Sequence, residues 1–209
     1  MITRCYSGLI EAIMMKRTIT GLALGLAMTV AAWAGLTPGQ EAPTFTADAS
    51  LAGKDFTFSL QDALAKGPVV VYFFPSAFTQ GCDLEAHTFA TDKDQFTAAG
   101  ATIIGVSADS IQRLNAFSSA PSYCAGKFPV ASDPHLKIAT EYGLTAGQAR
   151  PGMKDVRGVA IDHPFISRTT FVIGKDGKVI STFSSAAEHI SPEEHVTRSL
   201  AVVQHLAGK

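Results

Sequence analysis

Apolar residues gather in short uninterrupted runs after about residue 40, and these runs predict strands. Residues 69–74 read Val-Val-Val-Tyr-Phe-Phe, a β-branched and aromatic run that is typical of a strand buried on both faces of a sheet. Residues 102–107 repeat the pattern, and residues 128–131 form a shorter version of it. We therefore expect a central sheet with at least three buried strands.

The segments between these strands predict helices. Their apolar residues recur at helical spacing, and Gly100 and Gly143 stand where two of the helices should stop. The expected helices cover 82–99, 111–119 and 134–142. Because strands and helices alternate here, we expect the strands between them to pair in parallel.

The two ends of the chain predict antiparallel hairpins and a final helix. Short strands at 44–47 and 56–59 indicate an N-terminal hairpin, and 169–173 and 179–183 flank a glycine-rich turn. Ser191 at the N-cap, followed by Pro192 and Glu194, forms a capping box for a C-terminal helix.

Together these elements predict an α/β protein of thioredoxin-like fold, with a central mixed β-sheet flanked by helices. Residues 145–164 carry glycines, prolines and mixed charge without periodicity. We expect them to form a long loop that shapes an entrance.

The first 34 residues have a different pattern, that of a signal peptide. Lys16 and Arg17 precede an uncharged run at 19–32, and Ala32 and Ala34 fit a cleavage site before residue 35. An uncleaved anchor is the alternative, but these 14 residues fall short of the ~20 that span a bilayer. We expect translation to start at Met15 and one exported domain at 35–209, in the bacterial periplasm.

Composition limits the partners of this domain. The chain has 209 residues, 46% hydrophobic and 17% charged, which suits a single core. Removal of 1–34 takes away three basic residues and one acidic residue, so the net charge changes from −1 to about −3. An acidic domain without a Lys/Arg cluster is not expected to bind nucleic acid or to associate stably with a membrane.

Cys82 and Cys124 are the two cysteines that remain after the leader, and Cys82 has the more informative surroundings. It lies where the loop after strand 69–74 enters a helix, so free N–H groups and the helix dipole favour its thiolate. The Thr79 hydroxyl can lie beside the sulfur, and Pro75 stiffens the loop. Asp83, next to the cysteine, works against thiolate formation.

This stretch resembles the signature of the peroxiredoxins, in particular the PrxQ or bacterioferritin comigratory protein branch of the alkyl hydroperoxide reductase and thiol-specific antioxidant superfamily. The resemblance covers residues 39–206. The matching positions are Pro75, Thr79 and Cys82, supported by Gly39, Ala42, Pro43, Glu85 and the segment 168–173 that Arg168 opens.

The resemblance implies a thiol-dependent peroxidase that reduces hydrogen peroxide and organic hydroperoxides. Cys82 would attack the peroxide and become a sulfenic acid, Arg168 would contact the sulfur and the peroxide oxygens, and Glu85 would orient Arg168. No cofactor or metal is implied. The implied partners are a hydroperoxide and a thiol reductant, namely a thioredoxin-like protein, glutathione or a periplasmic disulfide reductase, and the protein would be a monomer or weak homodimer.

The second cysteine departs from the family pattern. Many PrxQ-like proteins carry a resolving cysteine five residues after the first, and this chain has His87 there. Cys124, 42 positions after Cys82, then has three open roles: a resolving thiol that requires local unfolding, half of a permanent disulfide, or an uninvolved thiol.

Other readings of the chain remain open. A non-catalytic domain that senses or binds, or a thiol-disulfide oxidoreductase acting on proteins, would share this fold. No Cys-x-x-Cys motif, phosphate loop or nucleophile elbow occurs. The histidines show no metal-ligand spacing and are expected to be solvated: His87, His135, His163, His189, His195 and His205.

Overall fold

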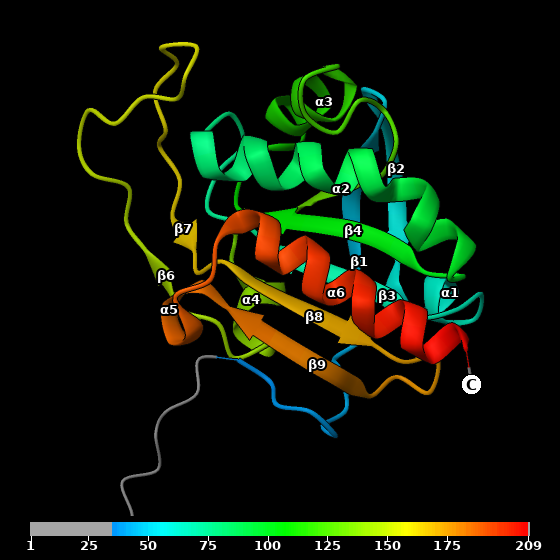
Figure 1. The fold of residues 1–209 in the computed structure, drawn as a ribbon. Coiled ribbons are helices and arrows are strands. Elements are labelled where there is room, and N and C mark those ends of the chain that lie inside the picture. The colour runs from blue at the N-terminus through cyan, green and yellow to red at the C-terminus, as the bar shows by residue number, and fades with distance from the viewer. Residues whose placement is uncertain (1–34, 209) are drawn as a thin grey trace, which may run out of the picture. The chain divides into compact units, whose positions relative to one another are not determined.

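Seven strands form one mixed sheet in this computed structural model, which describes residues 35–208 (Figure 1). The sheet order is β2-β1-β5-β4-β3-β8-β9, in which β3, β4 and β5 run parallel and the other neighbours pair antiparallel. The strands are β1 (Thr46–Leu51), β2 (Lys54–Ser59), β3 (Val69–Phe73), β4 (Thr102–Ser107), β5 (Val130–Ser132), β8 (Thr169–Ile173) and β9 (Val179–Ser184).

Helices cover both faces of this sheet. α2 (Gln80–Ala98), α3 (Ile111–Ser119) and α6 (Pro192–Ala207) pack on one face, where α2 and α6 lie side by side (Figure 1). α1 (Leu60–Leu64) and α4 (Lys137–Glu141) pack on the other. A short helix α5 (Ser185–Glu188) follows β9, and β6 (Ala146–Gly147) pairs with β7 (Phe165–Ile166) as a separate ribbon.

The predicted architecture is confirmed, namely a mixed sheet flanked by helices with hairpins at both ends and a C-terminal helix. Three elements have the predicted bounds, 102–107, 111–119 and 169–173. The N-terminal strands are longer than expected, and α2 begins two residues earlier than predicted. The predicted leader at 1–34, with its start at Met15, lies outside the described residues.

The central strand explains how two cores form on one sheet. All five residues of β3 are buried, and alternate side chains point to opposite faces. Tyr72 points toward α2, where its ring stacks on Phe89 with centroids 4.6 Å apart. A Cβ at Gly105 of β4 would lie 2.7 Å from the Tyr72 ring, so only glycine leaves room for this ring above the sheet.

The C-terminal helix is anchored by a buried histidine. The capping box of Ser191 and Glu194 is present as predicted. His195 has no exposed surface, and its ring nitrogens contact the Thr170 hydroxyl at 2.9 Å and the Ser185 hydroxyl at 2.8 Å. Burial above all, then the nearby arginine charges, lowers the pKa of His195 to about 3. The expectation that every histidine is solvated is therefore wrong for His195, because its ring is neutral and satisfied by hydroxyls.

Two buried tyrosines allow a matched test of the core. Among the described residues the Tyr72 hydroxyl has no hydrogen-bond partner, whereas the Tyr142 hydroxyl donates to the Pro43 carbonyl at 3.1 Å. We expect Tyr72→Phe to raise the free energy of unfolding by about 1 kcal/mol, because it removes an unsatisfied buried group, and Tyr142→Phe to lower it by about the same amount. Urea denaturation would measure both, and a loss of stability in Tyr72→Phe would show that its hydroxyl has a partner.

Candidate active site

Cys82 lies in the first turn of α2, at the end of the loop that leaves β3. Thr79 is the N-cap residue in an extended conformation, and the backbone N–H groups of Cys82 and Asp83 both donate to its carbonyl, at 2.9 and 2.8 Å. The loop is short because β3 ends at Phe73 and α2 begins at Gln80. The Cys82 sulfur is therefore fixed at the amino end of a long helix, in a residue that is only 2% exposed.

Arg168 reaches this sulfur from the neighbouring strand. Thr169 pairs with Phe73, so the start of β8 lies beside the end of β3 and brings Arg168 to the Cys82 loop. Its Nη2 donates to the Cys82 Sγ at 3.2 Å, and its Nη1 pairs with Glu85 Oε2. Glu85, one turn along α2 from the cysteine, is fully buried. The structure thus brings together three of the predicted site residues.

Thr79 and Pro75 also lie at this site. The Thr79 hydroxyl donates to the Ser76 carbonyl at 2.8 Å, and its presence beside Cys82 lowers the pKa of that thiol. Pro75 is half-buried at the start of the loop. The loop therefore places a hydroxyl and a backbone group beside the sulfur.

Burial dominates the electrostatics of the pocket. It raises the pKa of the Cys82 thiol, while the Arg168 charge and hydrogen bonds from Ser76 and Thr79 lower it and Glu85 raises it. The net direction is upward, so the helix N-terminus alone does not give the low pKa expected from the sequence. Burial likewise raises the pKa of Glu85 to about 7, against the opposing effect of Arg168.

Asp83 has a different role from the one expected. Burial raises its pKa to about 6, a hydrogen bond from the Phe78 backbone lowers it, and the nearby charges are those of Asp155, Arg157 and Arg113. The charges that shift the pKa of Asp83 therefore lie on the 151–160 segment and on α3. The carboxylate that opposes ionisation of Cys82 is that of Glu85.

Cys124 is packed in the same apolar cluster as Cys82, under α2 and α3. It lies in the turn that follows α3 and has no exposed surface, and both sulfurs are free thiols. Burial, and next the Asp83 charge, raise the pKa of Cys124 strongly. Its thiol is therefore protonated while it stays packed.

Sequence reasoning missed Asp109 and assigned His163 to solvent. Asp109 is fully buried; its Oδ2 accepts from the Ala77 N–H at 2.8 Å and its Oδ1 contacts His163 Nε2 at 2.8 Å. Burial raises the pKa of Asp109, but the hydrogen bond and charge of His163, together with hydrogen bonds from Ala77 and Ser107, outweigh it, so the pKa is lowered overall. Asp109 lies two residues after the end of buried strand β4, and a polar residue at the carboxyl end of a central parallel strand was the available signal.

Within residues 35–208, no group of three His, Cys, Asp or Glu side chains is placed to hold a metal ion. In that same range no helix combines the length and the hydropathy that crossing a membrane requires. The polar groups of the site, from Arg168, Thr79 and the Ser76 backbone, surround the sulfur of Cys82.

Sequence comparisons relate the chain to a known protein family. The AhpC/TSA family model matches residues 38–182. A putative peroxiredoxin of Mycobacterium tuberculosis is 36% identical over 148 residues, which cover 69% of this chain and 83% of that protein. Chloroplastic peroxiredoxin Q of Populus jackii is 33% identical over 174 residues, covering 83% of this chain and 71% of that one.

Solved structures are similar as well. The peroxidoxin BcpB of Mycobacterium tuberculosis superposes with a TM-score of 0.64 at 25% identity, covering 82% of this chain and 98% of that one. The bacterioferritin comigratory protein of Xanthomonas campestris, whose structures concern its alkyl peroxide reduction activity, gives a TM-score of 0.59 at 26% identity over 77% and 91% of the two chains.

The contact between Arg168 and the sulfur gives a direct test. In Arg168→Met we expect the pKa of Cys82 to rise, because a positive charge that favours the thiolate is removed. Peroxide consumption should fall about 100-fold or more at neutral pH, the usual cost of losing a donor aimed at developing charge. The thiolate absorbance as a function of pH and the rate of peroxide loss would measure the two effects.

Arg198→Met is the matched control, because Arg198 is more exposed and pairs with Glu188 and Glu194 on the surface. It should leave both the Cys82 titration and the rate unchanged. Equal losses in the two variants would mean that Arg168 has no special effect on the sulfur.

Proposed function

Because this chain belongs to the AhpC/TSA family and is a peroxiredoxin, a thiol-dependent peroxidase, we propose that Cys82 is its peroxidatic residue. The observation that carries the proposal is the 3.2 Å contact between Arg168 Nη2 and the Cys82 sulfur, in a pocket that Glu85 completes. A largely buried guanidinium held against a thiol favours the thiolate and remains in place for charge that develops on a substrate oxygen.

The proposed reaction uses these groups in one displacement. The Cys82 thiolate attacks one oxygen of the hydroperoxide, the S–O bond forms and the O–O bond breaks. The departing oxygen takes the proton that the thiol has lost and leaves as water or an alcohol, while Cys82 becomes a sulfenic acid. Arg168 stabilises the negative charge that moves from sulfur to the departing oxygen, and Thr79 and the Ser76 backbone orient the sulfur.

Glu85 acts in this scheme through Arg168. Its Oε2 pairs with Arg168 Nη1 and so leaves Nη2 directed at the sulfur. Because Glu85 is fully buried, its carboxylate would be costly without that pair. We infer that Glu85 positions the arginine, and that Pro75 fixes the loop that carries Thr79.

Cys124 is our proposed resolving thiol. It is the other free thiol of the described chain and lies in the same apolar cluster as Cys82. Its sulfur would attack the sulfenic sulfur of Cys82, forming the disulfide and releasing water. Since Cys124 is fully buried, the turn that holds it must open before this step.

A thiol reductant must then restore the dithiol. A thioredoxin-like protein, glutathione or a periplasmic disulfide reductase could each do so by thiol-disulfide exchange. The alkyl peroxide reduction activity of the related Xanthomonas campestris protein supports organic hydroperoxides, beside hydrogen peroxide, as substrates.

Cysteine substitutions test these assignments. With a small dithiol as reductant, Cys82→Ser should abolish hydroperoxide consumption by residues 35–209, because it removes the nucleophile. Cys124→Ser should still react once with a limiting peroxide and yield a Cys82 sulfenic acid, which mass spectrometry after dimedone labelling detects. Hydroperoxide consumption by Cys82→Ser would contradict the assignment of Cys82 as the nucleophile. A wild-type cycle that proceeds without a disulfide between Cys82 and Cys124 would contradict the assignment of Cys124 as the resolving thiol.

We also propose that the chain is exported to the bacterial periplasm. The supporting pattern is the basic pair Lys16 and Arg17, the apolar run 19–32 and the small residues before Gly35. When the full sequence is expressed in a Gram-negative host, we expect the periplasmic fraction to contain a chain that begins at Gly35. Mass spectrometry of the intact protein decides this, and a cytoplasmic chain that retains residues 15–34 would contradict export.

A further inference from the structure

Phe78 joins the active-site loop to the distant 151–160 segment. It is a non-glycine residue in the left-handed region, with φ of 60°, and it is 3% exposed. The guanidinium carbon of Arg157 lies 3.2 Å from the centroid of its ring. The Val156 N–H donates to the Phe78 carbonyl at 3.0 Å. Such a backbone conformation persists only where surrounding contacts enforce it, and these contacts do so.

Asp155 fixes the arginine in that position. Its Oδ2 accepts from Arg157 Nε at 3.0 Å and Nη2 at 2.7 Å, and also from Arg113 Nη2 at 2.8 Å. The same Arg113 nitrogen donates to the Ala77 carbonyl at 3.0 Å. Two guanidinium groups on one buried carboxylate therefore hold the 151–160 segment against the loop that precedes Cys82. We name Phe78, Arg113, Asp155 and Arg157 the Phe78 clamp.

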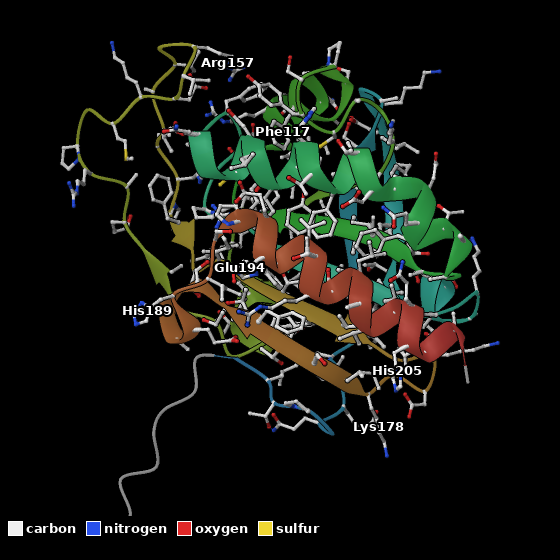
Figure 2. All side chains as sticks on the ribbon, viewed as in Figure 1. Phe117, Arg157, Lys178, His189, Glu194 and His205 are labelled. Carbon is white, nitrogen blue, oxygen red and sulfur yellow. The ribbon has the colours of Figure 1, made fainter. Side chains whose placement is uncertain are left out.

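Apolar packing does little to hold the tip of this segment. The side chains of Met153, Val156 and Val159 are exposed, to 37%, 60% and 48%. Figure 2 shows Arg157 on this loop, close to the amino end of α2 and to α3, which carries Phe117. The Phe78 clamp is therefore a main attachment of the tip, and weakening it should release the tip without unfolding the sheet.

The same phenylalanine also packs on the turn that holds Cys124. The ring of Tyr123, the residue before Cys124, meets Phe78 edge-on with centroids 5.4 Å apart. Tyr123 stacks on Phe117 at 5.2 Å, and Phe117 meets Phe78 edge-on at 5.2 Å. Phe78 thus contacts the clamp arginine and the Cys124 turn at once.

We propose that Arg157, oriented by Asp155, is a positioning residue that holds Phe78 against the Cys124 turn and so sets the rate at which Cys124 reaches oxidised Cys82. This inference rests on the proposed resolving role of Cys124. Because Cys124 is fully buried, and Tyr123 beside it packs on Phe78, the turn that carries Cys124 must open for the proposed attack on Cys82. The clamp keeps the peroxide-reducing arrangement and delays that movement.

The delay has a chemical consequence, because the sulfenic acid has two fates. In the first, the Cys124 sulfur attacks the sulfenic sulfur, the disulfide forms and water is released. In the second, the sulfenic sulfur takes one oxygen from a second hydroperoxide, the O–O bond breaks, the other oxygen departs in water or an alcohol, and Cys82 becomes a sulfinic acid. A slower opening gives the second reaction more time. The Phe78 clamp would therefore determine how readily excess peroxide inactivates the enzyme.

The opening itself can be measured without any peroxide. In a Cys82→Ser background Cys124 is the one thiol of residues 35–209, and its alkylation by N-ethylmaleimide reports opening of its turn. We expect Arg157→Ala to accelerate alkylation about tenfold, equivalent to about 1.4 kcal/mol, and Arg157→Lys to have a smaller effect because it keeps the charge without the planar stacking. Arg150→Ala, an exposed arginine on the same loop, should match the parent.

Hydrogen exchange of the same proteins separates local opening from general destabilisation. Amides of β3 and β4 should exchange as slowly in Arg157→Ala as in the parent. The proposal would be overturned if Arg157→Ala left the alkylation rate of Cys124 unchanged. It would also be overturned if amide exchange in β3 and β4 accelerated as much as the alkylation of Cys124.

In proteins that keep Cys82, the reaction with peroxide can be stopped at set times by alkylating the free thiols. Mass spectrometry then measures how much Cys82 has become disulfide and how much has become sulfinic acid. Arg157→Ala should form the Cys82 to Cys124 disulfide about tenfold faster and should accumulate less sulfinic acid in excess peroxide. If the disulfide forms at the same rate with and without Arg157, the clamp proposal is wrong and the resolving role of Cys124 stands. If no disulfide forms in either protein while alkylation still accelerates, the resolving role itself is wrong.

Discussion

The pairing of one largely buried arginine with one buried carboxylate and one buried thiol is the constraint on which the rest of the site depends. Arg168 contacts Cys82 and Glu85 in a pocket with almost no exposed surface. Burial acts against every charge in that pocket, as the raised pKa values of Cys82 and Glu85 show. A thiolate there is tolerable only because the guanidinium is fixed close by, and β8, β3 and α2 together fix it.

Much of this arrangement follows from local sequence. The strand at 69–74, the helix that begins near Cys82 and the capping box at Ser191 are strong local signals, and the structure has all three. The antiparallel pairing of β8 with β3 was not specified by any local pattern. Arg168 could be assigned to the site only from resemblance to a family, because nothing near residue 168 indicates a partner 86 residues away.

Other features could not be predicted, since they arise from packing between distant segments. The sequence shows six isolated histidines, but it does not show that His195 would lie among hydroxyls from β8 and α5, or that His163 would meet Asp109. The short elements α1, α5, β6 and β7 have too few residues for a periodic pattern. The direction in which the pKa of Cys82 shifts also depends on burial, whose effect outweighs that of the helix N-terminus identified in the sequence.

The distance along the chain between Cys82 and Arg168 also determines when the thiol acquires its chemistry. β8 joins the sheet beside β3 only after the intervening helices and strands have been made, so the contact is among the least local in the fold. Before that, Cys82 is an ordinary cysteine in an unfinished chain, without a cation beside it. Its particular reactivity is a property of the completed domain, and a newly synthesised polypeptide stays chemically latent until its last strands have docked.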